Sequence, residues 1–332
     1  MRTRQLALSG LMVALVMFIG IGCTKSHSQY TDQRPEKKID FLLNAHWNTK
    51  PGEKPKAEYQ LYNYQLPWYK GPRKSDRSMV VIVKEPWNMK TMVKSPKSMD
   101  SAVLKFSTFD QFVTGTYPYS FKQDIYFDTY NGQVVKYTMG SQDGCGNTFM
   151  EYINHGKTGS FTWHSYWNGH GTIQINVPTN KFDTFFDALP VYMRFRWKEK
   201  SYKVRVIQPL RANRPIDIIN PKQLKDPKDP TKGKKAWHLA DQKDAEKRGV
   251  PSIINVEITK GPVEDINGKK VVKFTVKHGK ATDYYWLAEK FPHTMIKMEA
   301  KGGKESKTLR KSKFFDYWVP ANRGKGQKNF LK

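Results

Sequence analysis

The stretch of sequence with the most reactive side chains runs from Ser141 to Trp167. It contains Cys145 in a glycine-rich turn and His164 within an aromatic segment. A cysteine becomes a nucleophile when a neighbouring base takes its proton, and glycines beside it leave backbone N–H groups free to hold an oxyanion. The pattern raises the hypothesis of a Cys145–His164 catalytic pair in a hydrolase or transferase.

The same residues also fit a purely structural interpretation. Cys145 would then be a small buried hydrophobic residue in a tight turn, and His164 a polar residue bonded to a neighbour. The chain has two cysteines, and the other is Cys23 near the N-terminus. Because His155, His164 and His170 lack compact ligand spacing and an acidic partner, we predict no metal site and no cofactor.

The N-terminus has the pattern of a bacterial lipoprotein signal. Arg2 and Arg4 precede an apolar run over residues 6–21. Gly20-Ile21-Gly22-Cys23 then resembles a lipobox, in which small residues precede a cysteine that is lipidated. The pattern predicts an exported protein that is held on a membrane by acyl chains.

The predicted processing places the mature N-terminus at a lipid anchor. We expect residues 1–23 to be the lipoprotein signal peptide with lipidated Cys23, and residues 24–35 to form a polar tether. Stable membrane anchoring takes about two lipid signals, which a triacylated cysteine exceeds. Thr24 after the cysteine favours the outer membrane, so we expect a lipid-anchored protein of the cell envelope that faces the periplasm.

The chain is strongly basic, with 57 Lys and Arg residues against 30 Asp and Glu and a formal net charge of +27. This balance indicates acidic surroundings, which in the envelope means anionic lipid or lipopolysaccharide and not nucleic acid. Alternation along an expected strand at 192–197 would place Arg194, Arg196 and Lys198 on one basic face. The alternative is an ordinary solvated surface.

Beyond the tether, the hydrophobic pattern has a period of two residues, which is typical of antiparallel strands. Tyr119, Phe121, Ile125 and Phe127 alternate with polar residues, and Asn267-Gly268 predicts a hairpin turn. We therefore predict a mainly β fold. It would have long curved antiparallel sheets, arranged as a half-barrel or a rolled sandwich, and a few short helices.

Two segments interrupt the strand pattern. Phe182, Phe185 and Leu189 have helical spacing, which predicts a short helix over residues 181–189. Residues 209–251 are rich in Pro, Lys and Asp and indicate an excursion or linker.

The linker suggests a division of the chain. We expect an N-terminal β-rich domain at 36–208, a C-terminal antiparallel β region at 252–320 and a basic tail at 321–332.

Several aromatic residues fall on the expected strands, and a curved sheet with an aromatic concave face can hold an apolar or sugar ligand. Tyr119, Phe121, Trp163 and Tyr166 are the candidate ligand-binding residues. The alternative is that they form ordinary core. We favour a non-catalytic lipoprotein that binds an apolar or envelope-derived ligand, or assembles with envelope components, over a Cys145-dependent enzyme.

Three short segments support a resemblance. They are TGTYPYSFKQDIY at 114–126, SQDGCGNTF at 141–149 and WHSYW at 163–167. They resemble a family of uncharacterised envelope lipoproteins of Bacteroidota-type bacteria, in which Tyr-Pro-Tyr-Ser, Gln-x-x-Cys-Gly and His-Ser-Tyr motifs follow in this order. The segment 284–301 is similar to the closing strands of an exported domain-of-unknown-function family. The resemblance covers about residues 57–318 and implies a fold and an address but no reaction.

The chain departs from the family pattern beside its cysteine. Gly144 and Asn147 stand where the family tends to have Trp and His. The missing histidine weakens the interpretation of Cys145 as a catalytic residue.

Overall fold

The structure is a computed structural model, and it describes most of the expected β region. The described residues are 56–67, 71–95, 101–115, 117–142, 144, 146–165, 172–207, 252–300 and 302–316. The expected signal peptide, lipidated Cys23, the tether, the excursion at 209–251 and the basic tail at 321–332 lie outside them. Within the described residues, no helix combines the length and the hydropathy that a membrane span requires.

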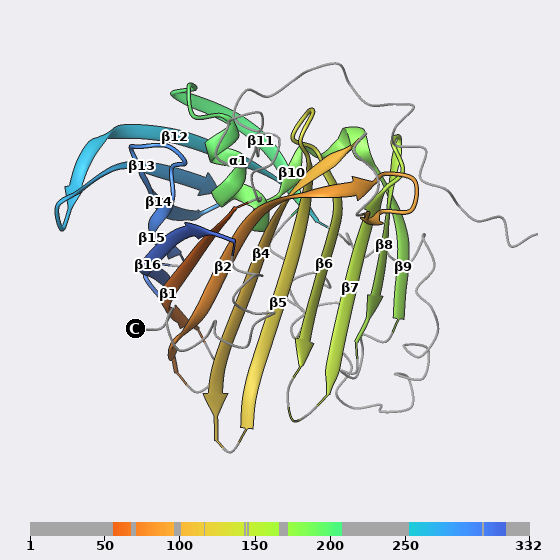
Figure 1. The fold of residues 1–332 in the computed structure, drawn as a ribbon, viewed down its shortest axis with the longest axis horizontal. Helices are drawn as coiled ribbons and strands as arrows, with labels where there is room; N and C mark the ends of the chain where they lie inside the picture. The colour runs from red at the N-terminus through yellow and green to blue at the C-terminus, as the bar shows by residue number, and fades with distance from the viewer. Residues whose placement is uncertain are drawn as a thin grey trace, which may run out of the picture.

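The described chain forms one open, curved sheet of sixteen strands, which bends around a short helix (Figure 1). The strand order is β10-β11-β12-β13-β14-β15-β16-β1-β2-β4-β5-β6-β7-β8-β9, with β3 beside β2. The pairings are antiparallel except for that of β10 with β11, which is parallel. The prediction of a mainly β fold with long curved antiparallel sheets and few short helices is confirmed.

The strands that precede the helix are mostly long. They are β1 (Ala57–Leu66), β2 (Arg73–Asn88), β3 (Val93–Lys94), β4 (Ala102–Thr114), β5 (Tyr117–Asp128), β6 (Val134–Gln142), β7 (Asn147–Asn154), β8 (Thr158–His164), β9 (Thr172–Pro178) and β10 (Thr184–Phe185). The strands that follow the helix are β11 (Ser201–Ile207), β12 (Ile253–Ile266), β13 (Lys269–His278), β14 (Ala281–Ala288), β15 (Met295–Ala300) and β16 (Glu305–Phe315).

Strands from both sides of the expected linker lie in the same sheet. β1 pairs with β16 along most of its length, and β11 pairs with β12. The N-terminal and C-terminal β regions therefore share a continuous hydrogen-bonded ladder. The turn between β12 and β13 has positive φ at Asn267 (52°) and Gly268 (76°), as the predicted hairpin requires.

The two faces of the sheet differ in what covers them. The inner face packs against the helix, and on β5 it carries Tyr119, Phe121, Ile125 and Phe127, as alternation predicted. The outer face carries the intervening residues of each strand. At one end of the outer face, the β2–β3 hairpin covers the sheet with Trp87, which packs in a cluster with residues of β4 and β6.

The region around the helix corrects the sequence prediction. Short 3₁₀ turns at Thr179–Lys181 and Phe186–Ala188 flank β10, and the helix α1 runs over Leu189–Phe195. The predicted helix at 181–189 and the predicted strand at 192–197 are therefore wrong. The buried residues of α1, among them Leu189, Val191 and Met193, lie on more than one side of the helix, so its pattern resembled alternation. Pro190 in its first turn is typical of a helix start.

Candidate ligand-binding site on the inner face

Part of the inner face is filled by the segment that includes β10 and α1. The ring of Phe185 lies 5.1 Å from Tyr137 and 5.0 Å from Tyr152, both edge-on. Leu189 and Met193 of α1 have no exposed surface. We call this part the filled region, because a segment of the chain itself occupies the curve of the sheet behind the upper ends of the central strands (Figure 1).

A buried ion pair attaches α1 to the sheet. Arg194 Nη1 lies 2.8 Å from Glu58 Oε2 on β1, and both side chains are almost fully buried. Thr294 donates a 2.6 Å hydrogen bond to the other carboxylate oxygen, and Gln60 donates to the same oxygen. Arg194 therefore does not share a basic face with Arg196 and Lys198, and that prediction is wrong because the segment is helical.

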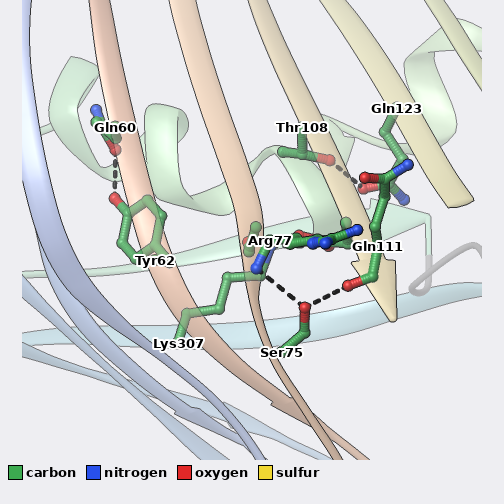
Figure 2. Close-up of polar contacts among 10 residues, drawn as sticks. Gln60, Tyr62, Ser75, Arg77, Thr108, Gln111, Gln123 and Lys307 are labelled. Carbon is green, nitrogen blue, oxygen red and sulfur yellow. Dashed lines mark hydrogen bonds and ion pairs between the residues drawn. The ribbon is translucent and has the colours of Figure 1, made fainter. Parts of the chain in front are cut away.

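The ion pair continues into a polar chain on β1. The Tyr62 hydroxyl contacts the side-chain oxygen of Gln60 (Figure 2). It also donates a 2.8 Å hydrogen bond to the Met295 carbonyl. Burial raises the pKa of Tyr62 far above its usual value, so its hydroxyl remains a neutral donor. Apart from Arg194 Nε, which has no partner, the network is satisfied internally, and it has the features of a structural anchor.

A second polar group connects strands from the two ends of the chain. Lys307 on β16 places its ammonium nitrogen 2.8 and 2.9 Å from the two carboxylate oxygens of Asp110 on β4. The hydroxyl of Ser78 donates to the same carboxylate, and the Lys307 nitrogen lies 4.7 Å above the centre of the Tyr64 ring. Lys307 thereby spans β1 and β2 on the inner face.

A chain of hydrogen bonds marks the boundary of the filled region. Thr108 donates to the Gln123 side-chain oxygen at 3.2 Å (Figure 2), and Gln123 donates to the Tyr137 hydroxyl at 2.9 Å. Tyr137 in turn donates to Asp187 at 3.2 Å. Burial, with the Asp187 carboxylate nearby, holds the pKa of Tyr137 well above its usual value. These groups are therefore also satisfied within the protein.

Beyond this boundary, aromatic rings form an array on β4 and β5. Phe112 and Tyr119 are stacked, with ring centres 5.2 Å apart and planes at 3°. Phe121 lies 5.4 Å from Phe112, and Tyr117 lies 5.5 Å from Tyr119. We call these four rings the aromatic platform. Tyr64 and Leu66 of β1 pack in the same cluster, whose members come from β1, β4 and β5.

Next to the platform are buried polar atoms without hydrogen-bond partners. Phe121 is directly opposite Ser141 on β6, and Ser141 is directly opposite Thr148 on β7. Trp163 on β8 is opposite Met150 on the same face, and it packs in the large cluster that includes Phe185. Ser141 Oγ, Thr148 Oγ1 and Trp163 Nε1 are all buried and unpaired. We call these three residues the polar row.

The structure brings some of the predicted ligand-binding residues together. Tyr119 and Phe121 are neighbours in the aromatic platform, and Trp163 belongs to the polar row. Tyr166 lies outside the described residues. Sequence reasoning missed Ser141 and Thr148. The signal in the sequence was Ser141, a hydroxyl residue that stands at the next alternate position after Tyr137 and Met139 and so falls on the same face of the strand.

The predicted catalytic pair is described only in part. Cys145 lies outside the described residues. Its neighbour Gly144 packs against the inner-face ring of Tyr117, where an added Cβ would lie 2.7 Å from a ring carbon. His164 is exposed on the outer face, opposite Phe149, with Nδ1 3.3 Å from the hydroxyl of Thr172. His164 therefore lies on the other side of the sheet from the contact that Gly144 makes.

The outer face has a polar hollow of about 500 Å³ where β1 meets β2 and β16. β1 has register shifts on both sides near Tyr62, and such irregularities bend a sheet locally. The hollow is lined by Asn63, Tyr64, Gln65, Lys74, Ser75, Asp76, Ser306 and Thr308. A contact that Ser75 makes with Gln111 on β4 supports one wall (Figure 2). In the described part of the chain, no group of three or more metal-binding side chains gathers at any position.

Comparison with known proteins does not identify a family. No protein-family model and no curated protein matches the chain. A structure with some likeness is the crystal structure of a beta-barrel-like protein of domain of unknown function DUF1849 from Brucella abortus. The two have 7% sequence identity and a TM-score of 0.41, over 79% of this chain and 98% of that chain. A likeness of this size carries no argument about function.

Proposed function

We propose that this protein is a non-catalytic envelope lipoprotein that binds an apolar or amphipathic envelope-derived ligand on the inner face of its sheet. The observation that carries the proposal is the aromatic platform beside the polar row. Ligand sites are typically lined by apolar and aromatic side chains with a small number of polar groups. The platform provides the aromatic side chains, and the polar row provides the polar groups.

The polar row adds buried polar groups to this surface. Buried polar atoms in folded proteins are nearly always hydrogen-bonded, because an unmade bond costs about 1–3 kcal/mol. Glu58, Tyr62 and Tyr137 in the filled region follow this rule, whereas Arg194 Nε and Thr184 Oγ1 there are buried without partners. Because unpaired buried atoms occur in both parts of the inner face, the polar row supports the proposal through its position beside the half-buried platform rings.

The cellular location proposed for this function comes from the sequence. A lipid anchor at Cys23 would hold the protein at the outer membrane, close to acyl chains that could be its ligands. The net charge of +27 would favour approach to anionic lipid or lipopolysaccharide phosphates. Transport or assembly of envelope components fits both features.

Binding of a fluorescent fatty-acid probe to delipidated protein tests the proposal. Phe121→Ala removes a half-buried platform ring and should weaken binding about tenfold, because burying one aromatic side chain contributes about 1.5–3 kcal/mol. Phe149→Ala is the matched control, since it removes an exposed ring from the outer face. We expect this control to bind like the unmodified protein. Absence of saturable binding, or equal losses in both variants, would contradict the proposal.

A further inference from the structure

We infer that the polar hollow on the outer face is a second binding site and that its ligand is an acidic saccharide. The inference goes beyond the proposed function, because the hollow and the aromatic platform lie on opposite faces of the sheet. It is carried by the irregular backbone of β1 that forms the hollow, by the arrangement of the polar side chains that line it, and by the charges among them.

The backbone of β1 forms the hollow. β1 loses regular register with β16 between Leu61 and Tyr62, and with β2 between Tyr62 and Tyr64. A strand that bulges against both of its neighbours bends locally and re-aims its side chains, and such irregularities are frequent beside functional sites. The resulting space of about 500 Å³ is within the range of about 300–1,000 Å³ that is typical of ligand pockets.

The register arranges the lining side chains in two rows. Gln65 on β1 is opposite Lys74 on β2 and Ser306 on β16, so this row crosses three strands. Asn63 is opposite Thr308 in the second row, two residues away along β1. Opposite residues share a face, neighbouring strands are about 4.8 Å apart, and the two rows are about 7 Å apart. The rows therefore present polar groups over an area that suits a mono- or disaccharide.

The lining groups match the hydroxyl groups of a sugar. Side-chain hydroxyls and amides both donate and accept hydrogen bonds, as every sugar hydroxyl does. The side chains of Asn63, Ser306 and Thr308 form no hydrogen bond with another described residue, so their bonding capacity is available to a ligand. Gln65 instead donates to the carbonyl oxygens of residues 303–304, both at 3.4 Å, and this contact holds the rim of the hollow. An acyl chain in this position would leave the lining groups unpaired, so the hollow favours a polar ligand.

The charges in the hollow favour an acidic saccharide over a neutral one. Arg310 Nη1 lies 3.4 Å from Asp76 Oδ2, so the carboxylate of the lining is already paired. Lys74 is exposed and forms no ion pair with a described carboxylate. A carboxylate or phosphate on the sugar would therefore pair with the Lys74 ammonium. The formal net charge of +27 favours the approach of such a ligand.

The test uses an immobilised panel of oligosaccharides of several sugars, each in a neutral, a uronate-containing and a phosphorylated form, and contains no lipid. We expect the protein to bind acidic forms about fivefold more tightly than their neutral counterparts, which is what a well-formed exposed ion pair contributes. Because salt screens exposed charges, this preference should shrink as the ionic strength rises. The uronate and phosphorylated forms distinguish a carboxylate from a phosphate as the negative group.

Variants locate the binding at the hollow. Lys74→Gln keeps most of the length of the side chain and removes its charge, so it should abolish the preference for acidic forms. Thr308→Val removes a hydroxyl and should weaken the binding of acidic and neutral forms alike, by about threefold. Lys277→Gln and Thr259→Val make the same changes at exposed outer-face positions of β13 and β12, and these matched controls should bind like the unmodified protein.

Three results would overturn the inference. The first is that the unmodified protein binds no member of the panel. The second is an equal loss in Lys74→Gln and Lys277→Gln, which would mean a general attraction of anions to a basic surface. The third is competition by inorganic phosphate as strong as that by a phosphorylated oligosaccharide, which would reduce the hollow to an anion site. Because the assay contains no lipid, none of these results bears on the binding proposed for the inner face.

Discussion

The filled region and the aromatic region of the inner face share strands but differ in what packs against the sheet. In the filled region, α1 and β10 occupy the curve of the sheet, and the buried charges Glu58 and Arg194 are paired. In the aromatic region, which comprises the platform and the adjoining Ser141 and Thr148, stacked rings lie next to hydroxyls without partners. The same curved sheet is thus covered by a segment of its own chain at one end and carries an array of side-chain rings at the other.

This difference suggests how a single curved sheet can be both stable and able to bind. The folding free energy comes from the region where chain segments fill the curve, because burial of apolar surface is the dominant favourable term. The aromatic region is free to keep unpaired donors at a modest cost. Changes in the two regions should therefore affect different properties, stability in one and binding in the other.

The largest expected effect is loss of the ion pair that attaches α1. Arg194→Met leaves Glu58 as an unpaired buried charge, and breaking one partner of a buried pair costs about 3–5 kcal/mol. We expect the free energy of unfolding to fall by this amount in urea titrations. The double variant Arg194→Met with Glu58→Gln should recover a large part of the loss, because no charge remains buried. A single variant within about 1 kcal/mol of the unmodified protein would contradict the anchoring role.

Two glycines allow a direct comparison of packing in the two regions. An added Cβ at Gly159 would lie 2.2 Å from the ring of Tyr152, which is buried among Phe182 and Phe185. An added Cβ at Gly144 would lie 2.7 Å from Tyr117, whose ring is only half-buried. We expect Gly159→Ala to destabilise by about 1–3 kcal/mol, as overpacking of a core does, and Gly144→Ala by less than about 1 kcal/mol.

Thermal unfolding of both variants measures this difference. Gly140→Ala is a suitable control, because its nearest contact is an ordinary 3.5 Å to a backbone oxygen. A larger loss at Gly144 than at Gly159 would show that the aromatic region is packed as rigidly as the filled one.

The sequence predicted the parts of this comparison that depend on local pattern. Alternation identified the inner face of β5, and Asn267-Gly268 identified a hairpin, since both signals arise within a few residues. The helix α1 was missed because its buried residues lie on more than one side. Its apolar residues therefore lack the polar stripe by which an amphipathic helix is recognised.

The candidate site was predictable only in part for a related reason. Tyr119, Phe121 and Trp163 were identified from residue type and alternation. The unpaired state of Ser141 and Thr148 depends on which groups approach from strands far away in sequence. The position of His164 on the outer face depends on which residues of β7 and β8 are paired. A shift of the pairing by one residue would place His164 on the inner face.

A moderate, pH-dependent effect is expected at His293, behind α1. Its ring is stacked 3.5 Å from that of Trp197 and its Nδ1 lies 3.1 Å from the Ala288 carbonyl oxygen. Burial, with smaller contributions from the Arg194 and Lys260 charges, lowers the pKa of His293 to about 4.

Because the unfolded chain binds a proton near pH 6.5 and the folded protein only near pH 4, stability is fully present above pH 6.5 and falls as the pH drops toward 4. His293→Asn tolerates the positive φ of this position and cannot titrate. We expect its unfolding midpoint to depend less steeply on pH between 6.5 and 4 than that of the unmodified protein. Parallel curves over this window would contradict the assignment.

The smallest expected effect is at His164, and it separates the two interpretations of the reactive segment. His164 is exposed on the outer face, so a ligand on the inner face does not contact it. We expect His164→Ala to change the dissociation constant of the fatty-acid probe by less than about twofold and to leave the unfolding midpoint within about 1 °C, as is usual for exposed positions. Phe121→Ala, measured in parallel, provides the positive reference. A loss of binding in His164→Ala as large as that in Phe121→Ala would mean that the ligand reaches the outer face, and the distinction between a binding inner face and a solvent-facing outer face would then fail.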